Sequence, residues 1–150
     1  MSKFFYRMQN ILNVKYKLED QAKTEFMLAN QVLREEEEKL QGLMDRKKGY
    51  EETVRQLLKN QLQVERIKEN QEAIRRMEEF IREQKIRVEE AARQVEIKAA
   101  KLTQLMQERK AQEKLKEKAF EEFLQEENAR ESKEIDELVS FTYGRKQREE

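Results

Sequence analysis

The side chains of this sequence that could do chemistry are almost all carboxylates and amines. Aspartate and glutamate together number 32, and their densest run is Glu35–Glu38. Two carboxylates act as general acid and base only where burial drives their pKa values apart. Histidine and cysteine are both absent, so the most common general base, the thiol nucleophile and the thiolate metal ligand are missing. We therefore interpret Glu35–Glu38 as a solvated helix face and not as an acid–base or metal site.

The sequence also lacks the elements that would hold a substrate or a cofactor. Catalysis needs a water-excluded pocket in which several groups converge. Only 37% of the residues are hydrophobic, there is no proline, and the three glycines (Gly42, Gly49 and Gly144) stand apart, so there is no glycine-rich phosphate loop. A chain with so few turn residues and so little apolar material does not build such a pocket. We predict that the chain is not an enzyme and binds no cofactor and no metal.

Charge and hydropathy argue against two further classes of protein. Lys+Arg and Asp+Glu are equal at 32 each, whereas a nucleic-acid binder needs a basic excess to neutralise phosphates. No apolar run approaches the roughly 18 residues of a membrane span, and the N-terminus lacks the apolar core and cleavage site of a signal peptide. We predict a cytoplasmic chain with no nucleic-acid partner.

A 3.5-residue apolar repeat decides between disorder and a coiled coil in so charged a chain. Steps of three and four residues from Phe5 visit mostly apolar positions over about eight heptads, which is typical of a coiled-coil helix. We call this the first seam. Its positions are Phe5, Met8, Leu12, Lys15, Glu19, Ala22, Phe26, Ala29, Leu33, Glu36, Leu40, Leu43, Lys47, Tyr50, Val54, Leu57, Gln61 and Val64.

A second seam follows, out of phase with the first by one residue. It runs through Ile67, Ile74, Met77, Ile81, Val88, Ala91, Val95, Leu102 and Leu105, loosens, and resumes at Phe120, Leu124, Ile135 and Leu138. The phase changes within the polar stretch 59–71, whereas Gly42 and Gly49 interrupt no seam. We predict a single coiled-coil hairpin over residues 1–150, with a first arm at about 3–62, a turn at about 60–71, a second arm at about 70–139 and a frayed tail at 140–150.

Charges at the two ends favour this hairpin over a parallel dimer. Residues 1–18 carry four bases and no acid, and residues 126–138 have an excess of acids. An antiparallel hairpin lays one segment beside the other, whereas a parallel dimer sets like charge against like. The expected fold is therefore all-α, two long helices in an antiparallel coiled-coil hairpin, and the expected state is a monomer.

Two groups of apolar residues could lie on the surface. Near the expected turn, Leu43, Tyr50, Met77 and Phe80 gather, and Phe80 lies beside the second seam, so part of this group should be exposed and could form an interface. The alternative is a widened core at the bend. At the N-terminus, residues 3–7 combine aromatic rings with Lys3 and Arg7, which is compatible with an interfacial membrane segment.

Four stretches, in order, are typical of one known family: FFYRMQNILNVKYKLEDQAK with its aromatic start, EEEEKLQGLMDRKKGYEE ending near a tyrosine, NQEAIRRMEEFIREQ, and the charged closing helix KLKEKAFEEFLQEENARESKEIDELVS. Through these stretches the sequence resembles the FliJ family of flagellar export proteins, over about residues 3–140. The family is similar to the central stalk of rotary ATPases. The resemblance implies a component of the bacterial flagellar type III export apparatus at the cytoplasmic face of the cell membrane.

The resemblance also implies partners and contact residues. By this resemblance, the paired terminal helices of the chain would enter the pore of a hexameric export ATPase and stimulate the enzyme. The contact surface would lie around Met8, Leu12, Lys15, Asp136 and Leu138. The other end of the hairpin would contact the membrane export gate, through Leu43, Arg46, Tyr50, Ala73, Met77 and Phe80. Arg46 and Ala73 depart from the aromatic residues often found there. Family members also handle export chaperones.

Two other readings remain open from the sequence. A general coiled-coil tether or chaperone outside the flagellar system would form a stable dimer and need no ATPase. A peripheral membrane protein would anchor itself through residues 1–18. Native mass and liposome flotation distinguish these from the export stalk.

Overall fold

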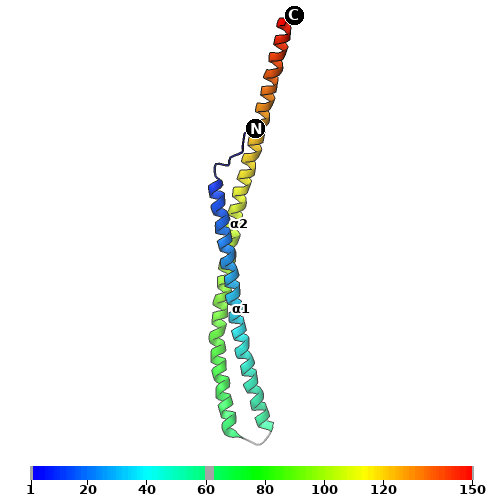
Figure 1. Cartoon of the computed structure of the whole chain (residues 1–150). Coiled ribbons are helices and arrows are strands. Elements are labelled where there is room, and N and C mark those ends of the chain that lie inside the picture. The colour runs from blue at the N-terminus through cyan, green and yellow to red at the C-terminus, as the bar shows by residue number, and fades with distance from the viewer. Residues whose placement is uncertain (1, 60–62, 150) are drawn as a thin grey trace. The chain divides into compact units, whose positions relative to one another are not determined.

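The computed structural model describes residues 2–59 and 63–149 and shows two long helices. Helix α1 spans Gln9–Lys59 and helix α2 spans Val64–Glu149, and the described residues include no strand. The two helices run antiparallel and pack on one another (Figure 1). The expected all-α coiled-coil hairpin is confirmed.

The helix bounds differ in detail from the ranges that the seams suggest. Helix α1 begins at Gln9 and not near residue 3. Of the expected turn at 60–71, residues 60–62 lie outside the described residues, and the chain is helical from Val64. Helix α2 continues through the segment 140–149, where we expected fraying, because neither proline nor a glycine with positive φ ends it.

Contacts divide the chain into two compact units. The terminal unit comprises residues 1–19 and 105–150, and the middle unit comprises residues 20–104. Each unit pairs a part of α1 with a part of α2.

The middle unit has the seam that the sequence predicts. On α1, every first-seam position from Ala22 to Leu57 is buried or half-buried, and on α2 the same holds for the second-seam positions from Ile67 to Leu102. Gln84 occupies a seam position between Ile81 and Val88, and its side-chain amide donates a hydrogen bond to the backbone carbonyl of Glu36 at 2.9 Å. The core is thus a narrow strip between the helices, in which the buried amide of Gln84 has a hydrogen-bond partner on the facing helix.

The seam of the terminal unit is more polar than expected. Leu12 is its most deeply buried apolar residue, with 1% of its surface exposed. On α2 the 3.5-residue repeat continues past Leu105 without interruption, through half-buried Arg109, Gln112, Lys116, Ala119 and Phe123. The residues at which we expected the seam to resume, Phe120, Leu124, Ile135 and Leu138, are exposed instead. Charged residues on the buried face concealed the true register.

Candidate functional site

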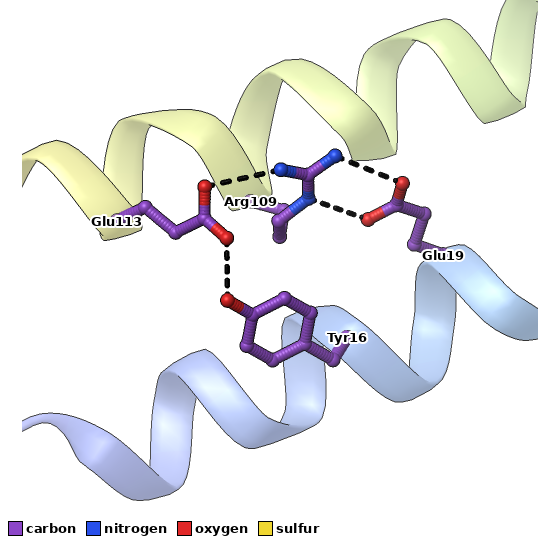
Figure 2. Close-up of polar contacts among 4 residues, drawn as sticks. All are labelled: Tyr16, Glu19, Arg109 and Glu113. Carbon is purple, nitrogen blue, oxygen red and sulfur yellow. Dashed lines mark hydrogen bonds and ion pairs between the residues drawn. The ribbon is translucent and has the colours of Figure 1, made fainter.

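A network of charged and polar side chains joins the two helices in the terminal unit (Figure 2). Glu19 is a first-seam position of α1 and is only 3% exposed. Arg109 of α2 donates two hydrogen bonds to its carboxylate, from Nε to Oε2 at 2.7 Å and from Nη2 to Oε1 at 3.1 Å. This two-pronged pairing matches the planar geometry of both groups and raises the pKa of the Arg109 guanidinium. The Arg109 guanidinium is therefore charged at neutral pH.

Glu113 and Tyr16, which lie beside the seam, extend this network. Arg109 Nη1 donates to Glu113 Oε2 at 3.0 Å, and the Tyr16 hydroxyl donates to the other oxygen of Glu113. The hydrogen bond from Tyr16 lowers the pKa of the Glu113 carboxyl and raises that of the phenol. The four side chains therefore form one continuous set of hydrogen bonds between α1 and α2.

The residues expected to face the ATPase all lie in the terminal unit but form two separate groups. Met8 directly precedes α1, Leu12 and Lys15 lie in its first turns, and Lys15 pairs with Glu108 of α2 at 3.1 Å. Asp136 and Leu138 lie much further along α2 and are exposed. The structure thus gathers the first three residues and does not bring the last two beside them.

An exposed apolar stripe on the last part of α2 extends beyond what sequence reasoning identified. Ile135, Leu138, Val139 and Tyr143 recur at helical spacing, and Phe141 is exposed beside them. The shallow hollows along this stripe are lined by residues of α2. The spacing of Val139 and Tyr143 from Ile135 was the signal available in the sequence.

The residues expected to face the export gate lie together in the middle unit and differ in exposure. Ala73 and Met77 are buried in the seam, and Leu43 and Tyr50 are half-buried. Arg46 is exposed, and Phe80 has 45% of its surface exposed. A salt bridge from Lys47 to Glu78 at 3.6 Å joins the helices among them. Arg46 and Phe80 are therefore the two of the six most accessible to a partner.

The middle unit also has an open groove that the sequence did not reveal. It has a volume of about 470 Å³, and apolar side chains of both helices line it between charged ones: Leu28, Ala29, Val32 and Ala91, with Glu25 and Lys98 at one end. Glu25 and Lys98 pair at 3.4 Å, and this hydrogen bond lowers the pKa of the Glu25 carboxyl. Ala29 and Ala91 are seam residues whose side chains are too small to fill the space between the two helices.

The described residues contain no cluster of three metal-binding side chains. None of the described helices is both long and apolar enough to cross a membrane.

Comparison with known proteins agrees with this arrangement. The chain matches the protein family described as "Flagellar FliJ protein" over residues 4–148, which is nearly its whole length. No curated protein and no solved structure matches it. Since the family match spans both helices, the chain belongs to the FliJ family, whose members are components of the flagellar protein export apparatus.

Proposed function

We propose that this chain is a non-enzymatic stalk that inserts into the hexameric flagellar export ATPase, stimulates it and couples it to the membrane export gate. It would work in the cytoplasm, peripherally attached at the cytoplasmic face of the membrane at the flagellar base. Membership of the FliJ family supports the setting. The exposed apolar stripe from Ile135 to Tyr143 carries the proposal, since such side chains on a charged helix mark a protein contact.

The ATPase would contact the terminal unit. Leu138 is 66% exposed, and its neighbours Ile135 and Val139 extend the same stripe. Met8 is also exposed, whereas Leu12 is buried and Lys15 is paired, so these two would support the surface and not touch the ring. Polar side chains elsewhere on the unit would limit non-specific adhesion inside a pore.

The export gate would contact the middle unit. Phe80 and Arg46 would supply the direct contacts, an aromatic ring and a guanidinium being common at binding hot spots. Ala73 and Met77 would hold α2 in place beneath them. An escort role for export chaperones would be a further activity of the same chain.

A hydrolysis assay tests the ATPase contact. Purified chain is titrated into the purified export ATPase and phosphate release is measured. We expect stimulation by the natural chain, weaker stimulation by Leu138→Ala, and full stimulation by Leu58→Ala, which alters another well-exposed leucine, in the middle unit. No stimulation at saturation would contradict the stalk role. If the chain instead prevents a denatured client protein from aggregating, that would favour a general tether or chaperone.

A binding titration with the cytoplasmic domain of the gate protein tests the second surface. Phe80→Ala should weaken binding by about tenfold or more, as expected for an aromatic hot spot. Ile86→Ala is the matched control, because Ile86 is an exposed apolar residue of the same helix and unit. Equal binding by the two variants would remove the proposed gate surface, provided that both retain the natural helix content.

A further inference from the structure

Residues 2–8 run along α2 without regular secondary structure, and we call this segment the strap (Figure 1). The Phe4 ring lies against Phe120 and Phe123, with centroid distances of 5.1 and 5.3 Å. Tyr6 is 9% exposed, whereas Phe5 between them is 83% exposed. This alternation is that of an extended chain, whose successive side chains point to opposite faces.

The sequence of the strap also fits a helix. The 3.5-residue repeat of α1 continues backwards from Leu12 to Met8 and Phe5, which would place both side chains on the seam. The strap contains neither proline nor glycine, so nothing in residues 2–8 excludes helical backbone. The extended and the helical arrangement would therefore bury different aromatic rings of the same segment.

Helix α1 begins at Gln9 without the signals that usually fix a helix start. Met8 precedes it, where a serine, threonine, aspartate or asparagine would cap the helix, and its first turn contains no acid. The Gln9 amide donates to the Tyr6 carbonyl at 3.1 Å, the contact of a single turn. Contacts of the strap with α2, and not the local sequence, thus hold the start of α1 where it is.

The contacts of the strap are also incomplete. The Arg130 guanidinium donates to the Ser2 hydroxyl at 2.7 Å and anchors its end. The Tyr6 hydroxyl, in contrast, is buried and has no hydrogen-bond partner among the residues that the structure describes. Since buried polar atoms are normally satisfied, this arrangement is less stable than its ring contacts alone suggest.

We propose that residues 2–8 exchange between the strap and a helical extension of α1 that packs Phe5 and Met8 on α2. In the extension, Phe4 leaves Phe120 and Phe123, and this aromatic surface of α2 opens. The exchange is a property of the chain by itself. Its consequence for the ATPase, a change in the surface that the terminal unit offers, rests on the proposed function.

A distance measurement on the full chain tests the exchange. The chain has no cysteine, so Lys3→Cys and Asn128→Cys, both at exposed positions, take one spin label each. Residues 7 and 8 form a turn in the strap, so only residues 3–6 change, from about 13 Å when extended to about 6 Å as a helix. The label separation should therefore differ by about 7 Å between the states. We expect two distances, the shorter one belonging to the strap.

Two neighbouring phenylalanines give matched variants with opposite effects. Phe4→Ala should lower the ratio of short to long distance about tenfold, because it removes both ring contacts of the strap. Phe5→Ala should raise that ratio, because Phe5 is exposed in the strap and packed only in the extension. A single distance that neither variant changes, or a broad distribution in Phe4→Ala, would overturn the exchange. Exchange without any effect on the ATPase would contradict only its consequence for the ATPase, whereas absence of stimulation by the natural chain would contradict only the proposed function.

Discussion

Replacing Leu12 with alanine removes the most completely buried large side chain among the described residues. The substitution deletes about three carbon groups, each worth about 0.8 kcal/mol when buried, so the loss of transfer free energy is about 2.4 kcal/mol. A rigid cavity would raise the cost toward the upper limit of about 5 kcal/mol for such changes. Two helices and a strap can close around the site more readily than a globular core, so we expect about 2–3 kcal/mol.

Urea unfolding followed by circular dichroism at 222 nm measures this change in the free energy of unfolding. The two compact units can unfold separately, so amide hydrogen exchange at residues 105–123 should report the terminal unit by itself. Leu138→Ala is the matched control in the same unit. Because Leu138 is 66% exposed, its replacement should cost less than about 1 kcal/mol.

Equal destabilisation by the two variants would refute the reasoning, since burial alone distinguishes them. A loss in Leu12→Ala confined to amides of the middle unit would also refute it. In either case Leu12 would not lie on a seam between α1 and α2 in solution.

Three further predictions concern the polar contacts. Glu19→Gln should lower the thermal midpoint by several degrees, and by more than Glu52→Gln at an exposed ion pair, because it deprives the Arg109 guanidinium of a buried carboxylate. The pKa of Glu25 is lowered in the fold by its hydrogen bond with Lys98. The stability that this pair contributes should therefore be fully present above the ordinary value of 4.5 and be lost as pH falls through the lowered pKa. Glu25→Gln should flatten this acidic part of the plot of thermal midpoint against pH. The pKa of Tyr16 is raised by its hydrogen bond to the Glu113 carboxylate, so the stability that this bond contributes should be present below about pH 10 and be lost as pH rises through the raised pKa. In Tyr16→Phe the decline of the thermal midpoint at alkaline pH should be smaller. An unchanged decline would contradict the network.

The sequence predicts the middle unit well because its seams are apolar and periodic there. From Ala22 to Leu57 and from Ile67 to Leu102, the spacing alone identified the buried positions. Burial on a two-helix seam depends mainly on that spacing, so local pattern suffices. The contact surfaces for the gate and the ATPase stay predictions, since spacing does not tell what a partner touches.

The terminal unit was less predictable because charged residues occupy buried positions. Arg109, Gln112 and Lys116 occupy the seam positions of α2 after Leu105. A search for apolar residues misses them and resumes wrongly at the exposed Phe120. The strap was missed for a different reason: helical spacing and extended alternation both describe residues 2–8, and only contacts with α2 select between them.

Polar seam residues also answer a question that an apolar repeat leaves open, namely which heptad of α1 meets which heptad of α2. An apolar seam with many similar side chains can slip by seven residues at modest cost. Slipping here would leave Glu19 buried without the Arg109 guanidinium and would separate Gln84 from Glu36. A buried charge without its partner costs far more than an exchanged pair of apolar contacts. We therefore infer that these pairs specify the alignment of the hairpin, and hence which residues of the terminal unit stand free for a partner.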